Sequence, residues 1–224
     1  MMNKKEQDKV IERYSTRFAE HGYSPKTLGW DKGKQNVRYE TLLKGFELQG
    51  KRILDIGCGF GDANIYLKSL GLEYHYTGID LVDVLVAKGK EIYAQDDYIN
   101  FVVGDFLSYE FDEEFDIIIA SGIFNFKMEG NDTNQQFIRD VIGKAFSMCR
   151  EGISFDFLSN KVDYELVHTF HSEPCDILNL FYAHTRCIAL NNDVMPFEFT
   201  VKGYKDQSFS AIDTLFLRYK SCKK

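Results

Sequence analysis

Apolar residues along this chain fall into short continuous runs and into longer stretches with helical spacing. The runs predict buried strands over residues 53–56, 76–80, 99–103, 115–121 and 153–158. The helical stretches predict helices over residues 5–20, 35–48, 62–69, 83–95, 132–149 and 174–182. Strands that alternate with helices in this way are typical of an α/β domain with a doubly wound, mostly parallel sheet.

The two ends of the chain extend this pattern. Residues 185–190 and 197–201 predict two further strands, which we expect to pair antiparallel and to complete a seven-stranded sheet. Residues 212–219 fit a strand or a helix equally well. The helix over residues 62–69 is expected to bury four apolar residues on the sheet, namely Ala63, Tyr66, Leu67 and Leu70. We therefore expect an N-terminal helical cap over residues 1–48 and an α/β domain over residues 49–224.

Composition is typical of a globular protein, and the net charge disfavours a nucleic-acid partner. The chain has 224 residues, 44% hydrophobic and 27% charged, which is ordinary for a globular protein with a full core. A net charge of −7, without a cluster of Lys and Arg except at the short ends, argues against a nucleic-acid partner, because binding nucleic acid requires several phosphates to be neutralised. Nothing in the sequence fixes the oligomeric state.

The cysteines and the first residues of the chain indicate the cellular compartment of the protein. The five cysteines are odd in number and form no Cys-x-x-Cys pair, so we expect neither a disulfide framework nor a zinc site. The first residues lack the apolar core of a secretion signal, and no apolar run approaches membrane-spanning length. We expect a cytoplasmic protein with no membrane partner.

Residues 53–62, Ile-Leu-Asp-Ile-Gly-Cys-Gly-Phe-Gly-Asp, carry the strongest chemical signal. A buried strand ends in three glycines at alternate positions, Gly57, Gly59 and Gly61, and a helix follows. Glycine makes such a tight turn at low cost, so a ligand can lie against the turn and the helix N-terminus. Asp55 precedes the first glycine by two residues. The stretch resembles motif I of class I S-adenosylmethionine (SAM)-dependent methyltransferases, whose glycine loop passes under the cofactor.

Three further segments resemble this family in the same order. Asp80 ends a strand 80 − 61 = 19 residues past the last glycine, where a carboxylate accepts hydrogen bonds from ribose hydroxyls. Residues 104–106 resemble the adenine-binding turn, and residues 115–121 resemble motif IV. The resemblance implies a Rossmann-like methyltransferase fold with SAM as cofactor. It implies cofactor contacts at Asp55, Gly57, Cys58, Gly59, Asp62, Asp80, Leu81, Gly104, Asp105, Phe106 and Ser121.

A dinucleotide-binding site is the rival interpretation of the glycine loop. Counting from Gly57, the third glycine of the G-x-G-x-x-G fingerprint falls on Asp62. An aspartate there would repel pyrophosphate, whereas SAM presents an ammonium and a sulfonium group. Asp55 and Asp62 thus favour SAM over NAD, although Asp80 fits either cofactor. An NAD-type oxidoreductase and a non-catalytic SAM-binding regulator stay as alternatives to a methyltransferase.

The residues before the glycine loop are expected to form a lid over the cofactor. Val10, Ile11, Tyr14 and Phe18 recur at helical spacing, and Tyr14 is a candidate cofactor contact.

Farther along this prefix, Lys34 and Arg38 lie four residues apart on one predicted helix face. A basic residue there suits the methionyl carboxylate, bidentately in the case of Arg38, and the alternative is a solvated face. Trp30, the only tryptophan, is either a lid aromatic or a packing anchor.

The acceptor is expected in the loops that leave the fourth and fifth strands, at residues 121–134 and 159–173. Candidate catalytic residues there are Asn125, His168 and His171. A histidine suits a general base because its pKa lies near neutrality, and we favour His171 for this role. The two histidines are spaced for one helix face but lack a third ligand, so we expect no metal.

Motif IV bears on the kind of acceptor. It reads Ser-Gly-Ile-Phe-Asn-Phe and lacks the Asn-Pro-Pro-Tyr-type tetrad of enzymes that methylate amino groups of bases or glutamine. We expect methyl transfer to a small molecule, at an oxygen. Asp156 and Glu198 are polar residues within apolar runs, so each is functional or half of a hydrogen-bonded pair.

Overall fold

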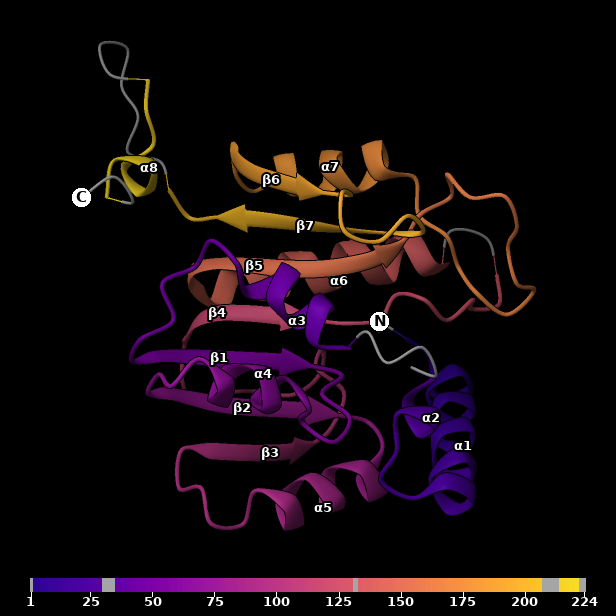
Figure 1. Cartoon of the computed structure of the whole chain (residues 1–224). Helices are drawn as coiled ribbons and strands as arrows, with labels where there is room; N and C mark the ends of the chain where they lie inside the picture. Colours follow the sequence, from indigo (N-terminus) through magenta and orange to yellow (C-terminus); the bar gives the residue numbers. More distant parts are fainter. Residues whose placement is uncertain (1, 30–34, 131–132, 207–213, 222–224) are drawn as a thin grey trace.

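The strands of the protein form a single seven-stranded sheet in the order β3-β2-β1-β4-β5-β7-β6 (Figure 1). The computed structural model describes residues 2–29, 35–130, 133–206 and 214–221. The strands are β1 (Lys51–Ile56), β2 (Tyr74–Asp80), β3 (Ile99–Val103), β4 (Phe115–Ala120), β5 (Cys149–Leu158), β6 (Cys187–Asn191) and β7 (Glu198–Tyr204). The predictions for Trp30 and Lys34 lie outside the described residues.

The direction of the strands confirms the expected fold class. Neighbouring strands from β3 through β5 run parallel, whereas β7 pairs antiparallel with both β5 and β6. The chain winds outward from β1 to β2 and β3, and then returns to β4 on the other side of β1. Ligands of open α/β sheets bind at such a switch point, beyond the carboxyl ends of the strands.

Helices cover both faces of the sheet. They are α1 (Lys4–His21), α2 (Pro25–Leu28), α3 (Gln35–Leu43), α4 (Ala63–Ser69), α5 (Asp83–Ile92), α6 (Thr133–Met148), α7 (Pro174–Tyr182) and α8 (Leu217–Ser221). One apolar core joins α3, α4 and α5 to the sheet, and a second joins α6 and α7 to the opposite face. In Figure 1, α1 and α2 lie beside the carboxyl ends of the strands, where they border the switch point.

Local chemistry sets the bounds of the N-terminal helices. Asn3 caps α1, because its side chain accepts a hydrogen bond from the Glu6 amide at 3.0 Å. The helix predicted over residues 35–48 stops at Leu43. Gly45 follows in a left-handed conformation with a φ of 94°, which glycine adopts readily.

Two other predictions were wrong in detail. Leu70 is 39% exposed rather than buried, because it lies just past the end of α4. Residues 168–171 lie in an irregular segment and not on a helix, so helical spacing does not relate the two histidines. No helix among the described residues is long and apolar enough to cross a membrane.

Candidate functional site

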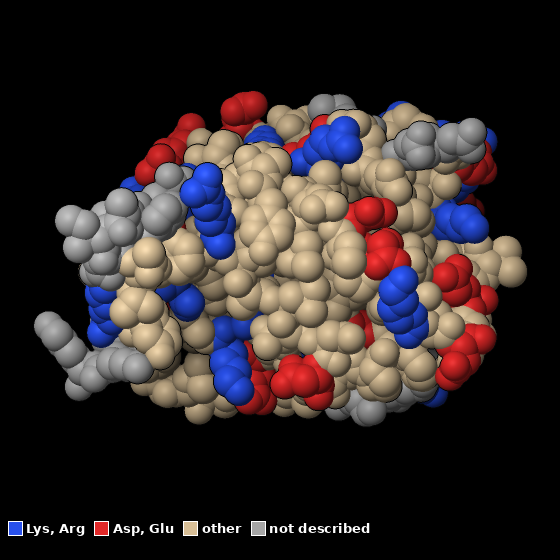
Figure 2. All heavy atoms as spheres, turned by 90° about the horizontal axis from the view of Figure 1, so that it is seen from above, with Lys and Arg blue, Asp and Glu red and all other residues tan. Residues whose placement is uncertain are grey.

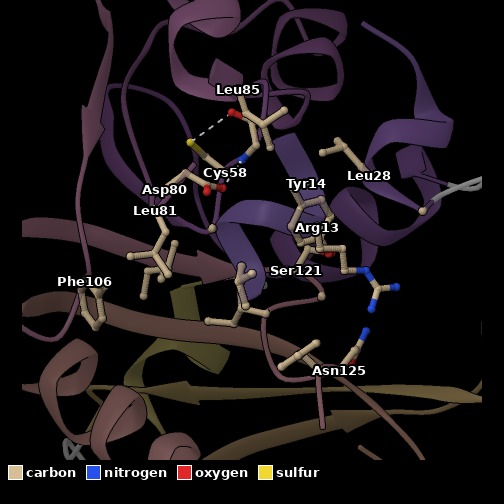
Figure 3. Close-up of a pocket in the computed structure, with 18 of the residues that line it drawn as sticks. Arg13, Tyr14, Leu28, Cys58, Asp80, Leu81, Leu85, Phe106, Ser121 and Asn125 are labelled. Carbon is tan, nitrogen blue, oxygen red and sulfur yellow. Dashed lines mark hydrogen bonds between the residues drawn. The ribbon is translucent and has the colours of Figure 1, made fainter. Parts of the chain in front are cut away.

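A cavity of about 590 Å³ lies at the carboxyl edge of the sheet, between α1 and the loops that leave β1 to β5 (Figure 3). Its walls contain most of the residues that the sequence singled out. From that set the lining includes Tyr14, Arg38, Asp55, Gly57, Cys58, Gly59, Asp80, Leu81, Gly104, Asp105, Phe106, Ser121, Asn125 and His168. Segments more than a hundred residues apart therefore line one cavity.

The glycine loop forms the floor of this cavity. The amides of Gly57 and Cys58 both donate to the carbonyl of Ile79, at 2.8 and 3.2 Å, which ties the loop to the end of β2. Gly57 has a φ of 70°, and a Cβ built on it would lie 2.2 Å from the Ile123 side chain. Only glycine fits this position, because any side chain is both strained and blocked.

Asp80 lies at the tip of β2 with its carboxylate held by backbone. The amide of Gly59 donates to Oδ2 at 2.8 Å, and the amide of Val82 donates to Oδ1 at 2.9 Å. Burial raises the pKa of Asp80, and these backbone hydrogen bonds oppose the rise. Each oxygen keeps a lone pair for another donor, so the group suits a ribose diol.

Asp55 is a buried carboxyl group at the end of β1. It is 2% exposed, and Tyr76 donates its hydroxyl hydrogen to it at 2.7 Å. Burial raises the pKa of Asp55 to about 7, although the Tyr76 hydrogen bond favours the ionised form. A cationic ligand in the cavity would favour the carboxylate.

Asp105 joins the loop after β3 to α1. Its Oδ1 accepts from the Leu107 amide at 3.1 Å, and its Oδ2 accepts from Gln7 Nε2 of α1 at 3.2 Å. Phe106 beside it is buried, and Leu81 lines the cavity nearby. An acceptor-only group beside apolar walls is suited to an adenine ring with its exocyclic amine.

Ser121 lies just past β4 and is paired with Asp156 of β5. The Ser121 hydroxyl donates to Asp156 at 2.6 Å, and the Gly122 amide donates to the same carboxylate at 2.7 Å. Burial raises the pKa of Asp156 to about 6, while the nearby Arg38 lowers it. Asp156 is thus a hydrogen-bonded group that shapes the turn after β4, one of the two roles expected for it.

Arg38 of α3 lines the cavity and is already engaged by an acid. Its guanidinium binds Glu198 at the start of β7 through two hydrogen bonds, with Nε 2.6 Å from Oε2. The two side chains are only 10% and 14% exposed. Glu198 is therefore half of a buried pair, and a cofactor carboxylate would compete with it for Arg38.

The three acceptor-side candidates differ in how they are placed. Asn125 and His168 line the cavity, whereas His171 does not. His171 lies 2.7 Å from the Ser159 carbonyl through Nδ1 and 3.0 Å from the Thr169 hydroxyl through Nε2. Both ring nitrogens are used in holding the loop, so the favoured general base is placed where it has no free nitrogen facing the cavity.

Asp62 also lies outside the cavity walls, although it ends the glycine motif. It accepts hydrogen bonds from Tyr23 at 3.1 Å and from Gln35 at 3.3 Å. These partners follow α1 and begin α3. Asp62 therefore links the glycine loop to the N-terminal helices, and its role as a cofactor contact stays a prediction.

Helix α1 supplies two lining residues that were not predicted from the sequence, Arg13 and Arg17. Together with Val10 and the predicted Tyr14 they are spaced i, i+3, i+4 and i+7, which is one helix face. The other two residues of the predicted stripe, Ile11 and Phe18, pack on Phe60 and Leu85. The spacing signal was present, but the arginines made that face resemble a solvated one.

Comparison with known proteins agrees with this site. Residues 53–143 match a family model described as a methyltransferase domain. This segment of the chain is therefore similar to a methyltransferase domain. The matched segment contains the glycine loop, Asp80, Asp105 and Ser121, which line the cavity.

Similarity to individual proteins extends beyond that segment. A provisionally assigned methyltransferase of Mycobacterium tuberculosis, Rv1506c, is 28% identical over 153 residues, covering 66% of this chain and 90% of that protein. The magnesium protoporphyrin IX methyltransferase of Synechocystis PCC 6803 with SAM has a TM-score of 0.65 at 14% identity, covering 88% and 96%. The DhpI–SAM–HEP complex has a TM-score of 0.66 at 14% identity, covering 90% and 99%. The two structures establish the shared fold.

The raised pKa of Asp55 predicts how stability depends on pH. The folded protein keeps this carboxyl protonated up to about pH 7, whereas the unfolded chain ionises it in its ordinary, lower range. Between these values the folded state binds more protons, so the free energy of unfolding should fall as pH rises from about 4 to about 7. Urea unfolding across this range should give a flatter slope for Asp55→Asn than for the wild type.

Asp83→Asn, on the exposed first turn of α5, is the matched control and should keep the wild-type slope. An Asp55→Asn protein with the wild-type slope would mean that Asp55 is ionised in the folded state throughout.

Proposed function

We propose that the cavity under α1 binds SAM and transfers its methyl group to a small-molecule acceptor, at an oxygen. The observation that carries this proposal is that the glycine loop, Asp80 and Asp105 line one cavity under a single helix. The match to a methyltransferase domain supports it independently. The free, buried thiols of Cys58, Cys149 and Cys187 support the further proposal of a reducing, cytoplasmic location.

The cofactor's parts are assigned to different walls. Asp80 would accept from the ribose hydroxyls, and Leu81, Phe106 and Asp105 would hold the adenine. The glycine loop at residues 57–59 and Asp55 would hold the methionyl group and its ammonium. Tyr14 and Arg38, which line the cavity beside the N-terminal helices, would hold its carboxylate. SAM supplies the electrophilic methyl group when it is bound.

The protein's contribution to the reaction is mainly placement of the acceptor. In-line positioning of a nucleophile against the methyl group supplies roughly 7–11 kcal/mol of the barrier reduction. A hydroxyl acceptor also has to lose a proton. His168 is the histidine that lines the cavity among the described residues, so it replaces His171 as our candidate base. Asn125 is held beside it by a backbone hydrogen bond between the Phe170 amide and its carbonyl, at 3.0 Å.

The first prediction tests the ribose contact. Asp80→Ala removes two charge-assisted hydrogen bonds to the cofactor and should weaken SAM binding by about 2–3 kcal/mol, as measured by titration calorimetry. Asp83→Ala removes an exposed acid three residues later and should leave the affinity unchanged. An unchanged SAM affinity in an Asp80→Ala protein with a native circular dichroism spectrum would show that Asp80 does not bind the ribose.

The second prediction tests methyl transfer itself. The protein should release S-adenosylhomocysteine (SAH) when SAM is incubated with a panel of small hydroxylated acceptors, and mass spectrometry should find the acceptor heavier by one methylene. Amine and thiol counterparts of the same acceptors, tested in parallel, show whether the methyl group goes to oxygen, nitrogen or sulfur. Calorimetric binding of SAM without turnover on any member would instead favour a SAM-binding protein that does not catalyse methyl transfer.

The third prediction tests the lid. Three loops near the cavity hold α1 and the turn that follows it, through Gln7 on Asp105, Lys9 on Glu129 and Tyr23 on Asp62. We therefore expect SAH to slow amide hydrogen exchange in α1 as well as in residues 57–62 and 104–106, because closure excludes water from the site. Helix α7 does not line the cavity and should not change.

Tyr23→Phe is the matched variant, because it keeps the ring packed on Phe60 and removes only the hydroxyl that binds Asp62. It should reduce the SAH-dependent protection of α1 but not that of the glycine loop. If SAH protects the loops alone in the wild type, α1 is a packing element and not a lid.

A further inference from the structure

The charged groups that line the cavity are almost all engaged by other parts of the protein. Tyr76 donates to Asp55, backbone amides hold Asp80, and Glu198 is paired with Arg38. Asp105 accepts from Gln7 and from the backbone. A charged ligand group in the cavity therefore needs a lining residue that has no partner within the protein. A lining residue without such a partner, in turn, is available to a ligand.

Two arginines of α1 line the cavity and differ in this respect. The guanidinium of Arg17 donates to the carbonyl of Lys26, which fixes it against α2. Arg13, one turn earlier, has neither an ion-pair nor a hydrogen-bond partner among the residues that the structure describes. A guanidinium carries five N–H donors and no acceptor, so its place on a cavity wall favours an anionic ligand.

Asn125 supplies a second donor from the opposite wall. Its Oδ1 accepts from the Leu158 amide at 3.3 Å, which fixes the orientation of the side-chain amide and directs Nδ2 the other way. Nδ2 has no hydrogen-bond partner within the described part of the chain. In Figure 3 the guanidinium of Arg13 and the amide nitrogen of Asn125 point toward one another. Two sets of N–H donors that face each other suit a ligand with an acceptor group between them.

The position of Asn125 assigns this pair to the acceptor side of the cavity. Asn125 lies in the loop after β4, and its carbonyl is bonded to Phe170 of the loop after β5. Residues 166, 168 and 169 of that second loop line the same wall. The loops assigned to the cofactor are different ones, at residues 57–59, 80–81 and 104–106.

We propose that Arg13 and Asn125 bind an oxyanion of the methyl acceptor, so that the substrate is a small molecule with a carboxylate, phosphate or phosphonate group. This inference rests on the proposed function, because it takes SAM to occupy the neighbouring loops. Arg13 comes from α1 and Asn125 from the loop after β4, so the anion also connects α1 to the α/β domain.

The test uses simple oxyanions, because the acceptor's carbon skeleton is not needed to detect the subsite. Full-length protein with 15N-labelled arginine is saturated with SAH, and the side-chain Nε–Hε signals are followed during titration with benzoate, inorganic phosphate or neutral benzamide. Arg13→Gln and Arg17→Gln proteins assign the two signals. We expect benzoate or phosphate to shift the Arg13 signal saturably, and we expect benzamide to leave it unchanged.

Asn125→Asp gives the sharpest variant. It keeps the oxygen that accepts from Leu158 but replaces the donor beside Arg13 with a second acceptor, which competes with the ligand for Arg13. Anion affinity should fall roughly tenfold or more, while SAH affinity stays at the wild-type value. The Arg17→Gln protein loses the same charge from the same helix face and should still bind the anion at Arg13.

Three results would overturn the proposal. Anions that shift the Arg13 and Arg17 signals equally and without saturation show that no subsite exists. An Asn125→Asp protein that binds the anion with wild-type affinity shows that Asn125 is not part of the subsite. SAH could shift the Arg13 signal when 5′-methylthioadenosine, which lacks the amino-acid part, does not. If the SAH-bound protein then binds no anion at Arg13, this residue binds the carboxylate of the cofactor. Failure of SAH to bind the wild type in calorimetry is a separate result and would reject the proposed function itself.

Discussion

The carboxylate of Asp80 holds the glycine loop in the shape on which the rest of the site depends. It accepts the Gly59 amide from the loop and the Val82 amide from the start of α5, so one group fixes both segments. Two further amides of the loop bind the Ile79 carbonyl next to it. The glycines can adopt this backbone at low cost, but only these contacts select it over other turns. Ribose binding and loop shape are therefore linked through the same two oxygen atoms.

Helix α1 completes the site through contacts of a different character. Its attachments to the cavity loops combine exposed polar contacts, such as Lys5 with Glu129 at 2.8 Å, with the packing of Ile11 and Phe18 on Phe60. Exposed ion pairs of this kind contribute about 0–1 kcal/mol each, so the apolar packing holds the helix more firmly than the ion pairs do. A ligand that fills the space beneath it adds contacts on both sides. We therefore expect a ligand to tighten a helix that already packs on the glycine loop.

The elements with local signals were predictable from the sequence. The glycine loop, the parallel strands and Asp80 follow from short apolar runs, turn residues and spacing, and the structure keeps their order. Asp62 was assigned to the cofactor because a carboxylate at that position suits the positive groups of SAM, but the sequence does not show which way the side chain points. Its partners Tyr23 and Gln35 come from the N-terminal helices, and no local pattern predicts those contacts.

Long-range pairing accounts for the other differences. Arg38 meets Glu198 across 160 residues of chain, and the sequence could show only that Glu198 was a polar residue in an apolar run. His171 had the right chemistry for a base, but the fold uses both of its ring nitrogens to hold a loop. Arg13 was hidden because a charged helix face looks the same in sequence whether it faces water or a cavity.

A crystal structure of the protein with SAH tests the central claim most directly. The account predicts electron density for the ribose hydroxyls on Asp80, for the adenine amine on Asp105 and for the homocysteine group across residues 57–59, with α1 closed over the ligand. Density for SAH that leaves Asp80 without a ribose contact, or a ligand bound outside the cavity beneath α1, would contradict it.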